Sequence, residues 1–238
     1  MPQIRLDKFF SSQNLATRKE VKELLKQGAI LVNGQTGNKA EDKIDPEKDE
    51  ICLNGTPVNY KKYLYLMMNK PQGVVSATND RSQTTVLDLV PPELFRPGLF
   101  PAGRLDKDTT GFLLLTDDGE FAHRILSPKK HIAKTYHALL SAPLSEEQMK
   151  SFENGLVLKD GFQCLPARIT PIGEGRTPLV EIVLWEGKYH QIKRMIGALG
   201  EKVLALKRVK MGGLPLDPDL QPGQCREILH KDVEKILE

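Results

Sequence analysis

A glycine-bounded loop at residues 103–111 leads directly into an apolar run, and this junction limits where one carboxylate can lie. The loop carries Asp106 beside basic residues, and the apolar run at 112–116 is typical of a buried strand. The Asp-Asp-Gly sequence at 117–119 then predicts a turn. A loop in this position can hold an acid rigidly at a sheet edge while leaving it open to a ligand. The alternative is that Asp106 only shapes a turn, the usual role of a loop aspartate.

The charge of the chain permits a nucleic-acid partner without requiring one. The formal net charge is only +3 over 238 residues, a length that can bury one large core or two smaller ones. Basic residues nevertheless gather in two clusters. These are Lys129, Lys130, His131, Lys134 and His137, and then Lys188, Lys193, Arg194, Lys202, Lys207, Arg208 and Lys210. Such clusters are commonly solvated faces, but here they accompany a candidate active loop.

The cysteines and the apolar runs favour a reduced, cytoplasmic location. Cys52, Cys164 and Cys225 are far apart and odd in number, with no Cys-x-x-Cys or His-x-x-x-His spacing, so we expect neither a disulfide framework nor a metal site. The start lacks an apolar signal core and no apolar run is long enough to span a membrane. Dinucleotide and phosphate-loop fingerprints are missing as well. We therefore expect no membrane association and no cofactor.

The first sixty residues (1–60) form a candidate domain of their own. Apolar positions predict a short helix from about Leu6 to Asn14. A second helix opens at Thr17, with Glu20 three residues later in the pattern of a capping box. Asn-Gly pairs at 33–34 and 54–55 predict tight connections between short strands.

This small unit resembles the S4 RNA-binding domain. The match covers residues 5–9 (Arg-Leu-Asp-Lys-Phe), the Arg18-Lys19 pair, Gly28 and residues 32–34 (Val-Asn-Gly). The resemblance implies that the unit docks on RNA, with Arg5, Arg18 and Lys19 as candidate contacts. The residues alone would describe a generic amphipathic helical cap.

The rest of the chain (61–238) predicts a larger α+β domain. Strands are expected near 63–68, 112–116, 135–140, 167–171, 179–184, 203–209 and 225–229. Helices are expected near 86–89, 120–126, 145–154, 190–199 and 230–238. Because these elements alternate without a strict βαβ repeat, we expect a mixed, mainly antiparallel sheet flanked by helices.

Four stretches of this region resemble the pseudouridine synthases. They are the Asp106 loop, residues 69–73 (Asn-Lys-Pro-Gln-Gly), residues 134–136 (Lys-Thr-Tyr) and residues 186–195 (Glu-Gly-Lys-Tyr-His-Gln-Ile-Lys-Arg-Met). Together with the N-terminal unit they look most like the RsuA-like branch, which modifies small-subunit ribosomal RNA. The resemblance implies an isomerase that converts one uridine of 16S rRNA to pseudouridine.

The resemblance also assigns roles to three candidate catalytic residues. Asp106 matches the family's catalytic aspartate, which acts as a nucleophile at C1′ or as a base at C2′ of the ribose; the residues leave both routes open. Lys193 matches the family's basic partner, and we expect it to keep Asp106 ionised because an adjacent cation favours a carboxylate's charged form. Tyr136 is implied to lie against the target uracil. Taken singly, Lys193 could be a solvated helix lysine and Tyr136 a core strand residue.

Further residues are candidates for RNA binding. Uridine in folded RNA must be extruded from its stack to react, and Arg104 could fill the vacated place or bind a phosphate. Ile192 could pack the other side of the base. Contacts with the RNA backbone are expected from Lys70, Lys129, Lys130, Arg194 and Arg208, and Lys134 is a further candidate for RNA binding.

The expected partner is ribosomal RNA, either naked or in a partly assembled small subunit, bound by a monomer. Two other functions stay open at this point. One is a large-subunit rRNA pseudouridine synthase of the same family, and the other is a non-catalytic rRNA-binding assembly factor. The joint presence of Asp106, Tyr136 and Lys193 favours an enzyme over the latter.

Overall fold

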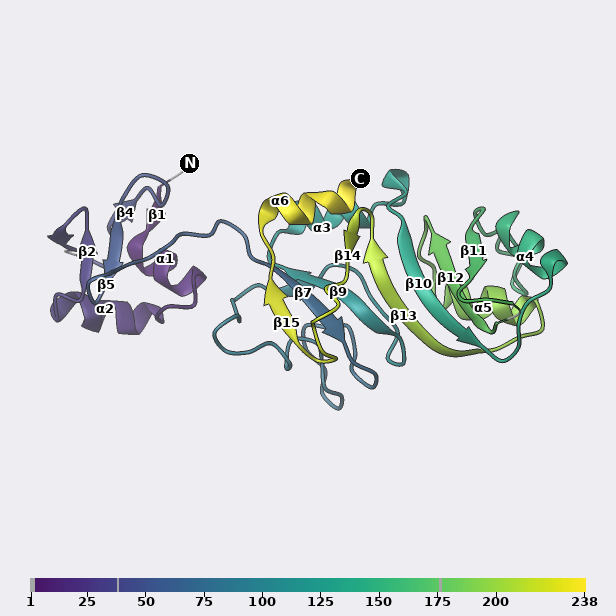
Figure 1. Ribbon diagram of the computed structural model, residues 1–238. Coiled ribbons are helices and arrows are strands. Elements are labelled where there is room, and N and C mark those ends of the chain that lie inside the picture. Colours follow the sequence, from purple (N-terminus) through teal and green to yellow (C-terminus); the bar gives the residue numbers. More distant parts are fainter. Residues whose placement is uncertain (1–2, 38, 176) are drawn as a thin grey trace. The chain divides into compact units, whose positions relative to one another are not determined.

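The computed structural model describes residues 3–37, 39–175 and 177–238. The chain divides into two compact units (Figure 1). The first comprises Met1–Leu64 together with Pro92–Leu99, and the second comprises Tyr65–Pro91 and Phe100–Glu238. Within the described residues, no helix combines the length and the apolar character needed to cross a membrane.

The N-terminal unit combines two helices with short strands. Its elements are β1 (Ile4–Arg5), α1 (Leu6–Ser12), α2 (Arg18–Lys26), β2 (Ile30–Val32), β3 (Gln35–Thr36), β4 (Lys43–Ile44), β5 (Ile51–Leu53) and β6 (Thr56–Pro57). Strands pair in the order β3-β2-β5-β6, and β1 pairs with β4. The expected capping box is confirmed, since the Thr17 side chain accepts from the Glu20 amide and the Glu20 carboxylate accepts from the Thr17 amide.

The core of this unit lies between the helices and the small sheet. Leu6, Phe10 and Val21 are fully buried, and the ring of Phe9 stacks on Tyr60 at 5.7 Å. The segment 92–99 contacts this unit through Arg96, and the Asn14 amide donates to the Pro92 carbonyl at 3.4 Å. Arg96 is buried, and its guanidinium donates to the carbonyl oxygens of Ser12 (2.6 Å) and Lys62 (3.2 Å).

The second unit is built on a nine-stranded sheet. Its strands are β7 (Tyr65–Lys70), β8 (Phe100–Pro101), β9 (Thr110–Thr116), β10 (Lys134–Leu140), β11 (Arg168–Pro171), β12 (Leu179–Leu184), β13 (Val203–Met211), β14 (Leu214–Pro215) and β15 (Cys225–Glu227). They run in the order β11-β12-β10-β13-β9-β7-β15, with β14 on β13 and β8 on β9. Among the described strands, all pairings are antiparallel except β9 with β13, so the expected mixed, mainly antiparallel sheet is confirmed.

The helices of this unit are short. They are α3 (Gly119–Leu126), α4 (Glu146–Glu153), α5 (Gln191–Ala198) and α6 (His230–Val233), with 3-10 turns η1 (Pro128–Lys130) and η2 (Glu234–Leu237). Figure 1 shows α3 and α6 in the half of the sheet with β7, β9 and β15, and α4 and α5 in the half with β11 and β12. Asp118 caps α3 by accepting from the Phe121 amide, and it also accepts from the Tyr65 hydroxyl at 2.6 Å. The prediction of a helix at 86–89 is wrong. The Asp88 carboxylate binds the Thr85 amide and hydroxyl there and closes a turn instead.

The parallel junction of β9 and β13 explains one glycine of the predicted loop. Gly111 lies opposite Arg208, with a φ of +98°, and a Cβ added to it would lie 2.2 Å from the Arg208 carbonyl oxygen. No side chain larger than hydrogen fits that approach. Gly111 therefore allows the two halves of the sheet to meet at the point where the Asp106 loop ends.

Candidate active site

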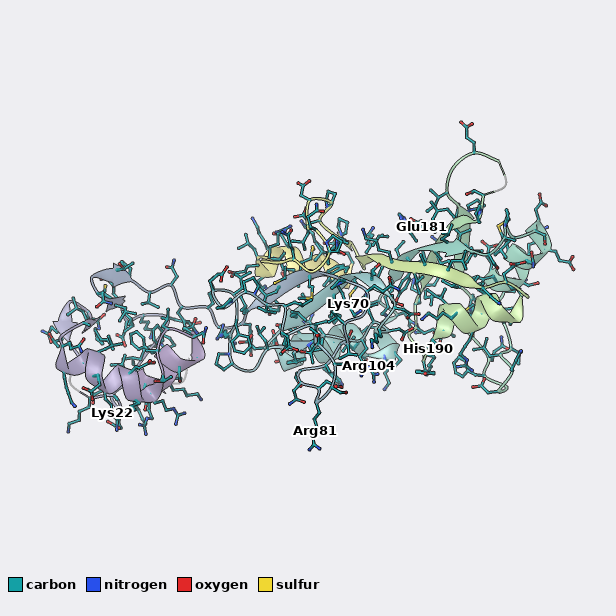
Figure 2. All side chains as sticks on the ribbon, turned by 90° about the horizontal axis from the view of Figure 1, so that it is seen from below. Lys22, Lys70, Arg81, Arg104, Glu181 and His190 are labelled. Atoms are coloured by element: carbon teal, nitrogen blue, oxygen red, sulfur yellow. The ribbon has the colours of Figure 1, made fainter. Side chains whose placement is uncertain are left out.

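A cavity of about 500 Å³ opens beside the β9–β13 junction. Its walls come from the 103–109 loop, the segment between α3 and β10, the segment between β12 and α5, and two side chains of β13. Figure 2 labels Arg104 on the first of these segments and His190 at the start of α5. The volume falls within the usual range for small-ligand sites.

Asp106 lies in this cavity with a nitrogen group beside each carboxylate oxygen. The Lys193 ammonium is 3.4 Å from Oδ2, and Nε2 of His190 is 3.5 Å from Oδ1. The structure therefore brings together Asp106 and Lys193, the pair that the sequence predicted. The Asp106 side chain is 29% exposed, so it is open to a ligand and not sealed from water as a fully buried acid would be.

Lys193 also binds a second carboxylate, that of Asp108. Its ammonium lies 2.5 Å from Oδ1 of Asp108. This hydrogen bond holds the pKa of Asp108 below its ordinary value. Partial burial by itself would lower the pKa of Lys193, but the hydrogen bond to Asp108 and the charges of Asp106 and Asp108 raise it above the ordinary value. Lys193 is thus a stable cation between two acids of one loop.

Lys70 stabilises the same loop from inside the protein. It is fully buried at the end of β7, and its ammonium donates to the carbonyl oxygens of Pro71, Asp106, Lys107 and Thr109 at 3.0–3.3 Å. Burial lowers its pKa to about 8, against the charges of Asp108 and Asp106, which raise it. The expected contact between Lys70 and the RNA backbone is therefore corrected, since its donors are used within the loop.

Three of the other predicted residues line the cavity wall. Tyr136 on β10 and Ile192 on α5 are both buried, with 9% and 4% exposure. Lys134, at the start of β10, donates to the Ile132 carbonyl at 2.8 Å. Burial and the neighbouring Arg208 charge lower its pKa to about 8. The cavity therefore joins an apolar wall to basic groups.

Arg104 and Arg194, the two arginines of this unit that were predicted to bind RNA, lie in different surroundings. Arg104 is exposed and lines the cavity. Arg194 is not among the lining residues, and its guanidinium is 2.5 Å from Asp160. Its Nη1 also lies 3.5 Å from the carbonyl oxygen of Tyr189, a residue that lines the cavity, so contact between Arg194 and RNA stays a prediction.

Sequence reasoning gave His190 no defined role and expected Arg208 to contact the RNA backbone, an expectation that the burial of Arg208 contradicts. His190 adopts a φ of +48°, a left-handed conformation that the local sequence does not predict. Arg208 is buried, and its Nε donates to the Phe112 carbonyl. Within the described residues, Nη2 of Arg208 and Oγ1 of Thr109 are buried without a hydrogen-bond partner, although both residues line the cavity. Because buried polar atoms normally have partners, these two mark a place for a polar ligand atom or a water molecule.

The three cations of the N-terminal unit that were predicted to bind RNA differ in whether they are already paired with a carboxylate of the protein. Arg5 binds Asp7 through two hydrogen bonds of 3.0 and 2.7 Å and lies 3.4 Å from Glu41. Arg18 and Lys19 are exposed at the start of α2 and, within the described residues, take part in no ion pair. Two of the three predicted cations are therefore free to meet a phosphate.

Comparisons with known families and structures match both units. The model of the RNA pseudouridylate synthase family matches residues 64–198, and that of the S4 domain matches residues 4–51. A solved pseudouridylate synthase structure, 36% identical, superposes with a TM-score of 0.68 over 98% of this chain and 99% of that one.

Full-length relatives have similar descriptions. An uncharacterized RNA pseudouridine synthase from Bacillus subtilis is 46% identical over 99% of both chains. Ribosomal small subunit pseudouridine synthase A from Vibrio cholerae is 39% identical over 98% of this chain and 99% of its own. The protein of the same description from Escherichia coli is 37% identical over 98% of this chain and 100% of its own.

Proposed function

The chain belongs to the RNA pseudouridylate synthase family and carries an N-terminal S4 domain, and on this basis we propose that it converts one uridine of 16S ribosomal RNA to pseudouridine through Asp106. The observation that supports this most is the Asp106 carboxylate, set between Lys193 and His190 in a cavity large enough for a nucleoside.

The reaction exchanges one bond to the ribose for another. The N1–C1′ bond breaks, the uracil turns, a C5–C1′ bond forms, and C5 loses a proton while N1 gains one. Substrate and product are isomers, so no electrons are gained or lost overall. A single carboxylate can serve as nucleophile at C1′ or as base at C2′. In either case the carboxylate must reach the ribose, and the Lys193 ammonium 3.4 Å from Oδ2 helps to hold it in position.

The cavity walls suit a flat base. Tyr136 and Ile192 supply an aromatic and an aliphatic surface near Asp106. Stacking of a base on an aromatic ring contributes roughly 1–3 kcal/mol. Extrusion of the uridine from its RNA stack costs a few kcal/mol, so contacts of this kind offset much of that cost. The exposed Arg104 is placed to fill the vacated position or to bind a phosphate.

The small subunit as target is supported by the full-length relatives described as ribosomal small subunit pseudouridine synthase A. The test is to map pseudouridines in the rRNA of cells with and without this protein. We expect one site in 16S rRNA to revert to uridine in its absence and to return with the wild-type gene. Loss of a 23S site instead would assign the protein to the large subunit. An unchanged map of both rRNAs would contradict the proposal.

We further propose that the S4 domain binds RNA phosphates through Arg18 and Lys19. Replacing both with alanine should weaken binding to structured rRNA fragments. It should also make the plot of log affinity against log salt shallower by roughly 1.4–1.8, the loss of two phosphate contacts. The matched control is Lys43→Ala with Lys48→Ala, which removes the same charge from exposed positions of the same unit. Equal salt slopes for the two double variants would contradict this docking role.

A further inference from the structure

An exposed aromatic pair lies at the mouth of the active-site cavity. Tyr189 is 74% exposed, and its ring stacks on the imidazole of His190 with centroids 3.8 Å apart and planes 19° apart. Both residues line the cavity. We propose that Tyr189, backed by His190, is a stacking platform for the base next to the target uridine in the RNA strand; this inference rests on the proposed function.

The segment that carries the pair is held in place before any ligand arrives. Gln191 is buried directly after His190, and its side chain accepts from the Lys188 amide (2.9 Å) and donates to the Glu186 carboxylate (2.6 Å). The helix α5 starts at this residue. A platform fixed in this way loses little conformational entropy when a base stacks on it.

The position of Tyr189 favours a neighbouring base over the target itself. His190 contacts Asp106 through Nε2 at 3.5 Å, and its ring also carries the Tyr189 ring, so an imidazole stands between the tyrosine and the acid. The target uracil has buried walls at Tyr136 and Ile192 instead. When that uracil leaves the RNA stack, the adjacent base loses a stacking partner. The exposed Tyr189 ring can replace the lost partner, since aromatic side chains stack on any base.

Tyr189 is also available for this contact. Single exposed aromatic residues are common on protein surfaces and do not by themselves indicate a binding site. Tyr189 differs because one face of its ring is already covered by a second ring that contacts the candidate catalytic acid. The large exposed area of the side chain indicates that the rest of the ring is open to solvent.

The experiment uses single-stranded RNA heptamers with a central uridine and 2-aminopurine on its 5′ or its 3′ side. The fluorescence of 2-aminopurine falls when the base stacks. With the full-length wild-type protein, and with Tyr189→Phe, we expect quenching on binding for one of the two probes. With Tyr189→Ala we expect the quenching to be lost and Kd to rise about 5–150-fold, the equivalent of roughly 1–3 kcal/mol.

An abasic nucleotide at the quenched position provides the matched control. Wild type and Tyr189→Ala should bind the abasic RNA equally, since the base that meets the ring is gone. A wild-type protein that binds without quenching either probe overturns the platform, as does a Tyr189→Ala variant that quenches like wild type. Circular dichroism of the variants checks the fold, which an exposed side chain should not disturb.

The outcomes separate this inference from the proposed function. If 16S rRNA is modified but Tyr189→Ala binds and quenches normally, only the platform is wrong. If quenching depends on Tyr189 while no rRNA site changes in cells lacking the protein, the platform stands as an RNA-binding feature and the proposed target is wrong.

Discussion

Asp106→Asn is expected to abolish pseudouridine formation while RNA binding persists. An amide is neither a nucleophile at C1′ nor a base at C2′, so the rate should fall by at least roughly 10⁴-fold. The fold should survive because the side chain is partly exposed. The hydrogen bonds that hold the loop also come from the Asp106 backbone carbonyl, which accepts from Lys70 and the Thr109 amide. The measurement is single-turnover formation of pseudouridine on an rRNA transcript, with affinity determined separately.

Asp108→Asn is the matched control for this variant. Asp108 shares the Lys193 ammonium with Asp106, but it does not line the cavity. We expect its loss to slow the reaction far less than the loss of Asp106. If Asp106→Asn makes pseudouridine at the wild-type rate, the protein does not work through this acid. If both variants bind RNA normally and the wild type itself is inactive on every rRNA, a non-catalytic role in assembly would be favoured.

Lys193→Met should cause the second-largest loss of activity. The substitution leaves Asp106 and Asp108 on one loop without the cation that both contact. Removing one preorganised electrostatic partner typically costs about 10²–10³-fold in rate. The hydrogen bond from Lys193 lowers the pKa of Asp108, so its loss should raise that pKa and move the acidic limb of the pH–rate profile to higher pH than in the wild type.

The pH dependence distinguishes this effect from simple misfolding. Lys193→Arg keeps the charge and should recover part of the rate with a profile closer to wild type, although arginine offers a planar fork instead of a point charge. An identical pH–rate profile for Lys193→Met and the wild type would contradict the charge-pairing argument. The thermal transition of each variant provides the check on folding.

Local sequence patterns predicted the elements whose ends are set by local contacts. Thr17 with Glu20 forms the capping box that their spacing predicts, and Ser145 with Gln148 forms a second one. The failure at 86–89 has a different cause. Thr85 and Asp88 make the same reciprocal contacts as a capping box, but Pro91 and Pro92 follow almost at once and disfavour the helical conformation, so only a turn forms.

Features that depend on distant parts of the chain were harder to predict. The burial of Lys70 follows from four carbonyl groups that the folded loop gathers around it, and no local pattern distinguishes it from a surface lysine. The contact between His190 and Asp106 depends on a left-handed residue just before α5. The link between Lys193 and Asp108 joins residues far apart in sequence. The family resemblance selected Asp106 and Lys193 as candidates, and the structure brings these two side chains together, but the supporting contacts came only from the three-dimensional arrangement.

The buried guanidinium of Arg96 has a practical consequence for anyone who wishes to transplant the S4 module. The carbonyl groups that accept its hydrogen bonds belong to Ser12 and Lys62, near the start of the chain. The arginine itself lies in the later segment Pro92–Leu99. A graft that ends near residue 60 would lack Arg96 and leave the Ser12 carbonyl without the guanidinium that donates to it. A working graft must therefore also carry the segment Pro92–Leu99.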